Sequence, residues 1–464
     1  MVLLNRLHTR LGDFWWYSLM IFCAQRAADC TNVFVGLYLV PKYVAPSELG
    51  AVMPLTQFAG CLALPIAIFA STFRNEIVNL ASAKEFGQLK TLLRGTFIAT
   101  GIFLVLAIVA CWLVLPAYLE RMRLAKGSLG ILIVVLAFVT SISPIFNNAL
   151  QALRKFKATS VIGILGAPIR LISMVLVLPL RPISGYFAGQ TSTPAFGIVA
   201  SIFALRKEFS VKAEPYWNRG VFRRVARFAF FTTIGSIASS VWILVSSTVL
   251  RQRLPELDSA AYYMASRFSE ISGFLSMTLI FTMFPFTAKL AREGKSTNPL
   301  VIKSSLAMLV FCLPLAAIFW FWGASILNLL PHGAEYSSYH WIIPWMIGIS
   351  CLNSIASFYT GAEVSAERFG YLWWSAPTFL SFAGALLFVT GYGYFTAFLP
   401  TSVTDFLKAH NVTSISAFLM WMTAIEAIRV LCCAVQMYLN RAPTPQTQLR
   451  DERHSSQLYP QNRC

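Results

Sequence analysis

The feature that most constrains this chain is the recurrence, from end to end, of apolar stretches close to 20 residues long. Such a stretch crosses the roughly 30 Å hydrocarbon core of a bilayer as a helix. Lipid offers no hydrogen-bond partners, and a helix satisfies its own backbone N–H and C=O groups. The sequence therefore predicts an all-α, polytopic membrane protein. We expect twelve transmembrane spans, at residues 14–40, 49–71, 95–118, 128–150, 158–180, 184–205, 228–250, 260–286, 299–323, 339–361, 370–396 and 413–439.

Composition and charge support a membrane location. Apolar residues make up 57% of the 464 and charged residues only 12%, whereas about a quarter of a soluble protein is charged. The net charge of +18 comes from basic residues spread along the margins of the spans, so we expect contact with membrane lipids and no nucleic-acid partner. Most of the 37 Lys and Arg fall on one side, which predicts a multi-pass protein of the cell (inner or plasma) membrane with both termini cytoplasmic.

The chain has weak internal similarity between its halves. Residues 38–50 (YLVPKYVAPSELG) resemble residues 249–261 (VLRQRLPELDSAA), and Ala-Pro168 in the fifth span matches Ala-Pro377 in the eleventh at nearly the same offset. A duplicated bundle with a cavity between its halves is a transporter architecture. We expect a six-helix bundle at 1–205, a basic cytoplasmic linker at 206–227, a second six-helix bundle at 228–440 and a disordered cytoplasmic tail at 441–464.

Polar residues interrupt the first span. At about 100° per residue, Gln25, Arg26, Asp29 and Asn32 form one stripe along a helix. A charged side chain at the centre of a spanning helix costs about 2.5–3.5 kcal/mol on insertion scales. This stripe is therefore expected to face protein or a water-filled cavity.

Two interpretations of the stripe remain open. Arg26 and Asp29 are three residues apart and could simply neutralise each other, a spacing repeated in Arg267/Glu270 and again in a pair near the end of the last span, Glu426/Arg429. Alternatively, Asp29 orients Arg26 toward an anionic ligand, for which phosphate is the best geometric match.

Arg170 favours the second interpretation. It lies near the middle of the fifth span with no acidic residue nearby in the sequence, so its partner must come from another helix or from a substrate.

Motifs for cofactors and metals are missing from the sequence. Residues 294–296 (GKS) echo the end of a phosphate-binding loop, but Lys289 stands where that loop needs a glycine. No histidine–acid metal pattern or nucleophile elbow is present, so we expect no cofactor and no metal site. Uphill work would then draw on an ion gradient, the membrane potential or consumption of the product outside.

Several segments together resemble a known family. They are residues 38–50, the Arg-bearing first span, the helix that opens with residues 260–265 (AAYYMA) and ends at Pro285, and residues 330–336 (LPHGAEY). In these the chain resembles polysaccharide flippases of the O-antigen type, within the multidrug/oligosaccharidyl-lipid/polysaccharide exporter superfamily. It departs from their pattern at Val52, where an aromatic residue often follows the turn glycine. The resemblance implies two six-helix bundles facing each other in a V.

The resemblance also implies a function. Such flippases move polyprenyl-diphosphate-linked sugars from the inner to the outer leaflet, and arginines in the first span of related lipid II flippases engage the diphosphate. Arg26 matches that placement. The expected substrate is a lipid-linked oligosaccharide, with a polysaccharide polymerase or glycosyltransferases as further partners. The expected substrate-binding residues are Gln25, Arg26, Asp29, Asn32, Arg170, Arg267 and Glu270.

Two other functions are alternatives to a flippase. A cation-coupled multidrug or metabolite exporter of the same fold would depend on Asp29 more than on Arg26. A membrane enzyme that polymerises or ligates the same sugars would need a sizeable external loop to position acid and base groups, and the external loops here are short. We therefore expect a transporter and not an enzyme.

Overall fold

The computed structural model describes residues 26–82, 85–124, 129–153, 155–216, 219–292, 295–366, 368–389 and 414–439. Residues 26–34 are α-helical and continue through a π-helical turn, η1 (Val35–Leu39), into α2 (Val40–Tyr43); together we call them the first helix. The first helix and the next five form the N-lobe: α3 (Pro46–Ser82), α4 (Phe86–Arg121), α5 (Leu129–Ala152), α6 (Phe156–Val177) and α7 (Pro182–Phe209).

The second half of the chain forms the C-lobe. Its long helices are α8 (Arg219–Arg253), α9 (Glu256–Arg292), α10 (Asn298–Asn328), α12 (Ile342–Ser365), α13 (Leu372–Val389) and α15 (Ile415–Leu439). A short α11 (Gly333–Tyr336) and a 3-10 turn, η2 (Ser337–Tyr339), connect α10 to α12. Within the described ranges no strand occurs.

Each of the twelve predicted spans falls on a helix in its described residues; residues 14–25 of the first span, 128 of the fourth, 390–396 of the eleventh and 413 of the twelfth lie outside the described residues. Seven of the described helices are long and apolar enough by themselves to cross a membrane. Several helices are longer than the predicted spans: α3 runs on to Ser82, and α8 begins at Arg219, inside the predicted linker. The predicted tail at 441–464 lies outside the described residues.

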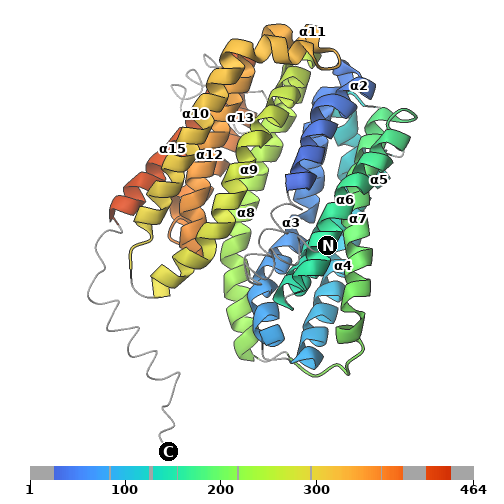
Figure 1. Ribbon diagram of the computed structural model, residues 1–464, viewed down its shortest axis with the longest axis vertical. Coiled ribbons are helices and arrows are strands. Elements are labelled where there is room, and N and C mark those ends of the chain that lie inside the picture. The colour runs from blue at the N-terminus through green and yellow to red at the C-terminus, as the bar shows by residue number, and fades with distance from the viewer. Residues whose placement is uncertain are drawn as a thin grey trace, which may run out of the picture.

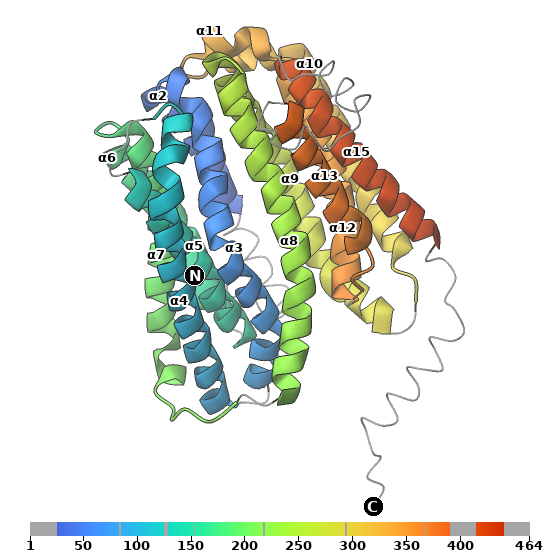
Figure 2. The ribbon, with the colours of Figure 1, turned by 180° about the vertical axis from the view of Figure 1, so that it is seen from behind.

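Helices pack closely within each lobe and also across the two lobes. In the N-lobe α5 packs on α3 and α7, and α6 packs on α7; in the C-lobe α12 packs on α9, α10 and α15, and α13 packs on α8. Between the lobes, α3 packs on α8 and α9. Figures 1 and 2 show that the α2 and α11 ends of the lobes lie close together, whereas α10, α12 and α15 diverge from α4 and α7 toward the opposite end.

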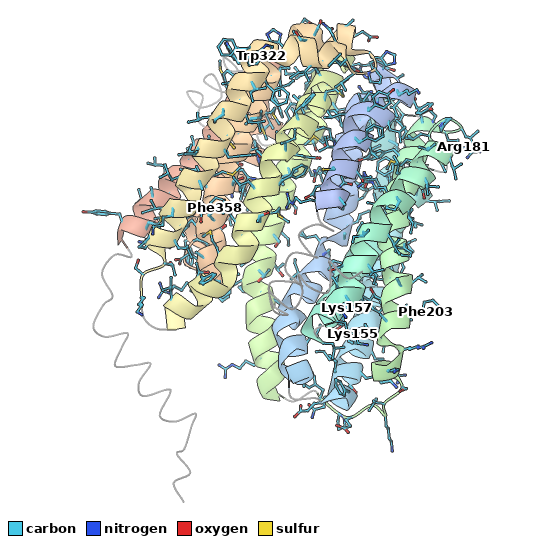
Figure 3. The ribbon with its side chains drawn as sticks, in the orientation of Figure 1. Lys155, Lys157, Arg181, Phe203, Trp322 and Phe358 are labelled. Carbon is cyan, nitrogen blue, oxygen red and sulfur yellow. The ribbon has the colours of Figure 1, made fainter. Side chains whose placement is uncertain are left out.

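Apolar side chains cover the outer surface of the bundle. Three of them are each more than 70% exposed: Leu113, Leu180 and Phe321. Such exposure would be costly in a soluble protein, but in a bilayer these side chains are solvated by lipid. Figure 3 shows Trp322 near the α11 end and Arg181 on the rim of the N-lobe, with Lys155 and Lys157 toward the opposite end. The molecule is a multi-pass membrane protein.

The helix boundaries agree with the predicted repeat. The first helix ends at Tyr43 and α3 begins at Pro46; α8 ends at Arg253 and α9 begins at Glu256, so a two-residue turn separates each pair. Proline favours the first turn of a helix, where its missing N–H costs nothing, and the acidic Glu256 favours the same position through the helix dipole. The matched prolines of the fifth and eleventh spans lie inside α6 and α13.

Candidate functional site

Arg26 connects the first helix to α9 of the other lobe. Its Nη1 lies 3.3 Å from Asp29 Oδ2, and its Nη2 donates to Thr278 Oγ1 at 3.1 Å. The guanidinium also sits 5.3 Å from the centre of the Phe274 ring. The side chains of Arg26 and Asp29 are each 22% exposed, so this ion pair is largely but not completely buried.

Arg170, on α6, donates a hydrogen bond from Nη1 to Asn32 Oδ1 of the first helix. Of the two predicted sources of a partner, another helix or a substrate, the structure shows the first, and that partner is a neutral amide. Among the described residues its Nε is buried without a hydrogen-bond acceptor. Arg170 also interacts electrostatically with Arg267 and Glu270, which places these three charged groups close together.

Arg267 reaches from α9 to the first helix. Its Nη1 donates to Glu270 Oε1 at 2.5 Å, and its guanidinium lies 4.8 Å from the centre of the Tyr263 ring. A Cβ placed on Gly36 would come within 2.8 Å of Arg267 Cδ, so the absence of a side chain at Gly36 leaves room for the Arg267 side chain against the first helix. Gly36 lies in the π-helical turn η1, an irregularity that often marks functional sites.

Six of the seven predicted site residues thus lie along the contact between the first helix, α6 and α9, and we call them the interlobe cluster: Arg26, Asp29, Asn32, Arg170, Arg267 and Glu270. The seventh, Gln25, lies outside the described residues. From Arg26 to Gly36 the helix rises about 15 Å. The Arg26–Asp29 pair therefore lies farther from the α2 end of the first helix than Gly36, which Arg267 contacts. Three arginines face two carboxylates, which leaves an excess of one positive charge.

A cavity of about 920 Å³ opens beside this cluster, mainly within the C-lobe. Its walls come from α8, α9, α12, α13 and α15, with three residues of α3. Arg267 and Glu270 line it, whereas the other four members of the interlobe cluster are not among its lining residues in the described part of the chain. Arg267 therefore borders both the cavity and the contact between the lobes.

Hydroxyl side chains dominate the polar part of the cavity wall. They are Thr56, Thr232, Ser236, Ser239, Ser246, Ser247, Ser266, Ser269, Ser350, Ser357, Thr360 and Ser375. The sequence repeat predicts a cavity between the halves, and not this hydroxyl-lined cavity mainly within the C-lobe. A signal was present on α8, where Thr232, Ser236 and Ser239 recur at the spacing of one helical face.

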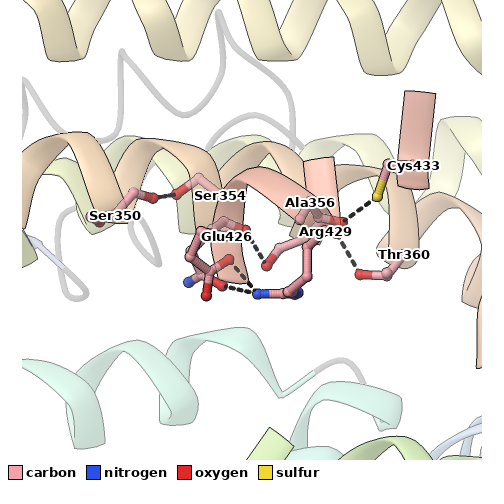
Figure 4. A network of polar contacts seen from close by, with 9 residues as sticks. Ser350, Ser354, Ala356, Thr360, Glu426, Arg429 and Cys433 are labelled. Atoms are coloured by element: carbon pink, nitrogen blue, oxygen red, sulfur yellow. Dashed lines mark hydrogen bonds and ion pairs between the residues drawn. The ribbon is translucent and has the colours of Figure 1, made fainter. Parts of the chain in front are cut away.

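A second ion pair lines the far wall of the cavity, and Figure 4 shows it between α15 and α12. Arg429 Nη1 donates to Glu426 Oε2 at 2.6 Å and to Asn353 Oδ1 at 2.9 Å, and its guanidinium lies 4.5 Å from the centre of the Phe379 ring. The side chains of Glu426 and Arg429 are 7% and 8% exposed. This geometry agrees with the predicted mutual neutralisation of the pair.

The lobes also meet at the end that carries α2 and α11, which we call the closed end. Glu256 of α9 lies 3.6 Å from Arg123 at the end of α4 and 3.7 Å from Arg251 of α8. A Cβ on Gly50 of α3 would lie only 2.5 Å from Ser259 Cβ of α9, so the two repeat-related turns touch here. The closed end is thus held by an ion network and by a backbone approach that needs glycine.

Metal ligands do not converge anywhere in the described residues: no three His, Cys, Asp or Glu side chains are grouped so that they could hold an ion. The chemistry that the described site offers is therefore recognition by guanidinium groups, hydroxyls and aromatic rings.

Comparison with known proteins gives no match to a family model and no significant match to a curated sequence. Solved structures do match over nearly the whole chain. A multidrug-resistance MATE-family transporter of the MOP superfamily in an inward-facing conformation has a TM-score of 0.62 at 12% identity, over 91% of this chain and 96% of its own. A MOP-superfamily transporter from Pyrococcus furiosus, whose reversed binding-pocket polarity suggests a different function, has a TM-score of 0.59 at 10% identity, over 93% and 98%. A MATE structure in a bent conformation gives 0.56 at 12%, over 92% and 96%. At these identities the likeness shows the fold, and the chain has the fold of the MATE transporters.

Proposed function

We propose that this chain is a flippase that moves a polyprenyl-diphosphate-linked oligosaccharide from the inner to the outer leaflet of the cell membrane by alternating access. The observation that carries the proposal is the interlobe cluster, with its excess of one positive charge and with Arg170 held by a neutral amide. Burying that charge is costly unless an anion accompanies it during the working cycle.

A diphosphate suits the donors that this cluster offers. Both Arg170 and Arg267 keep a buried Nε without a hydrogen-bond acceptor among the described residues. A guanidinium presents its N–H groups in a planar fork that matches phosphate oxygens, and two phosphate groups could accept from both side chains. Asp29 and Glu270 would orient their arginines without removing the overall positive charge.

The arrangement of the lobes supports alternating access. They meet at the closed end and diverge toward the other end. The distribution of Lys and Arg in the sequence predicts that the divergent end and both termini are cytoplasmic. A lipid-linked substrate would then enter from the inner leaflet, with its headgroup between the lobes and its polyprenyl tail in the surrounding bilayer. Glycosyltransferases would supply this substrate inside, and a polysaccharide polymerase would consume it outside.

Complementation in cells that depend on this chain for surface polysaccharide tests the proposal. We expect Arg26→Ala and Arg170→Ala to stop lipid-linked sugar from reaching the outer leaflet while the protein still inserts, and Arg26→Lys to restore export only partly, because an ammonium lacks the planar fork. Arg181→Ala serves as the matched control, since Arg181 is an exposed arginine on the rim of the N-lobe. Normal surface polysaccharide from both interlobe variants would refute the proposal.

A cation-coupled exporter is the second candidate, and the fold shared with a multidrug-resistance transporter favours it. That function needs a cavity carboxylate free to bind a cation or a proton. Asp29, Glu270 and Glu426 each pair with an arginine instead. A transport assay that compares Asp29→Asn with Arg26→Gln separates the candidates, because an exporter would lose activity mainly with the first and a flippase mainly with the second.

A further inference from the structure

We propose that the C-lobe cavity is the binding site for the glycan portion of the substrate, and that it selects an uncharged, hydroxyl-rich group. This inference rests on the proposed function and deepens it, because it separates the site of the sugar from the site of the diphosphate. The sugar would lie among α8, α9, α12 and α13, and the diphosphate would lie at the interlobe cluster.

The hydrogen bonds that the hydroxyls already make determine which ligand groups they can bind. Most of the lining hydroxyls donate their proton to a backbone carbonyl of their own helix; these are Thr56, Ser239, Ser246, Ser247, Ser266, Ser269, Ser357 and Thr360. A hydroxyl has one proton and two acceptor lone pairs, so these side chains have only acceptor capacity left. The wall therefore suits a ligand rich in O–H or N–H donors, as a sugar is.

The charges of the wall exclude the other ligand classes. The lining carries two arginines and two carboxylates, and each carboxylate is hydrogen-bonded to its arginine at 2.5 or 2.6 Å. The cavity is thus neutral as a whole. An organic cation would find no free carboxylate in the described wall, and an anion would meet mostly hydroxyls whose protons are already donated to backbone carbonyls.

The size and lining of the cavity suit a sugar. About 920 Å³ is at the upper end of the usual range for small-molecule sites, roughly 300–1,000 Å³, and leaves room for several sugar rings. The half-buried Tyr371 adds aromatic surface for the apolar face of a sugar ring. Arg267 lies on the boundary with the interlobe cluster, so a diphosphate held there would place the attached sugar at the mouth of the cavity.

Titration calorimetry on the full chain in nanodiscs tests the assignment with three probes. Farnesyl diphosphate carries the anion alone, farnesyl diphosphate bearing one neutral hexose or N-acetylhexosamine adds the sugar, and tetraphenylphosphonium is an organic cation. The test variant is Ser239→Ala/Ser357→Ala, which removes one acceptor hydroxyl from α8 and one from α12. Each of these hydroxyls donates to a backbone carbonyl of its own helix, so the variant removes no hydrogen bond between helices that the structure describes for them. The matched control is Ser240→Ala/Ser354→Ala, on the same helices but outside the cavity lining.

We expect the sugar-bearing probes to bind the wild type more tightly than farnesyl diphosphate does. The test variant should lose about tenfold in affinity for the sugar-bearing probes, the equivalent of two neutral hydrogen bonds, and none for farnesyl diphosphate. The control variant should bind all probes as the wild type does. Absence of a sugar-dependent gain, a gain that survives in the test variant, or tetraphenylphosphonium binding that depends on the same hydroxyls would each overturn the assignment.

Arg170→Ala separates this inference from the proposed function. If the diphosphate lies at the interlobe cluster, that variant weakens binding of farnesyl diphosphate with or without a sugar. If instead both affinities stay unchanged while Ser239→Ala/Ser357→Ala still removes the sugar-dependent gain, the diphosphate assignment fails and the glycan site stands.

Discussion

Substituting alanine for Gly50 should force open the closed end. The added Cβ would lie 2.5 Å from Ser259 Cβ and 3.1–3.2 Å from backbone atoms of Ser259 and Ala260, so no side-chain rotation relieves the clash. Ordinary contact requires about 1 Å more separation between α3 and α9. Overpacking of this kind costs about 1–3 kcal/mol. Because the clash exists only where the lobes meet, this cost shifts the equilibrium roughly 5- to 150-fold away from the closed end.

Pulsed electron–electron resonance can measure the shift. Spin labels at Lys42 on α2 and Glu335 on α11 report the separation of the lobes, in a background from which the nine native cysteines are removed. Gly50→Ala should populate longer distances than the parent. Gly60→Ala on the same helix is the control, because a Cβ there meets nothing within 4 Å.

The result cannot arise from helix propensity, since alanine in place of glycine favours a helix by roughly 0.5–1 kcal/mol. An unchanged distance distribution in a folded, monodisperse Gly50→Ala protein would refute the reasoning. So would an equal shift in Gly60→Ala.

Three further changes test other parts of the structure. Glu256→Gln removes the carboxylate that lies 3.6 Å from Arg123 of the N-lobe, so the same spin labels should show a more open closed end; because both side chains are more than a third exposed, the shift should be at most about 1 kcal/mol, and a parental distribution would contradict this. Glu426→Gln strands the buried Arg429 and should destabilise the protein by about 3–5 kcal/mol, seen as a lower Tm that Glu426→Gln/Arg429→Gln largely recovers; an equal loss in the double variant would argue against the pairing. Gly36→Ala should displace the Arg267 side chain from its place against the first helix and reduce export of lipid-linked sugar, and full export would speak against a role for this contact.

The membrane topology was predictable because it follows from solvation. A long apolar stretch has one stable conformation in lipid, so every predicted span falls on a helix where its residues are described. The ends were less predictable: α3 continues to Ser82 and α8 begins at Arg219, because polar residues extend a helix beyond the hydrocarbon without leaving a hydropathy signal.

The site was predictable only where partners are close in sequence. The pairs Arg26/Asp29, Arg267/Glu270 and Glu426/Arg429 follow from a spacing of three residues on a helix. The contact of Arg170 with Asn32 joins α6 to the first helix, and no periodicity encodes which helices become neighbours. The C-lobe cavity likewise depends on five helices from the C-lobe and on α3, so its hydroxyl lining is visible only once they are packed.

Reconstitution tests the central claim most directly. Purified full-length chain is placed in liposomes with a fluorescent polyprenyl-diphosphate-linked oligosaccharide, and a membrane-impermeant quencher reports the fraction of label that crosses between leaflets. The account predicts rapid crossing with the wild type, crossing at the protein-free rate with Arg170→Ala, and no uptake of tetraphenylphosphonium. Crossing no faster than in protein-free vesicles with the wild type, or equal crossing with Arg170→Ala, would contradict it.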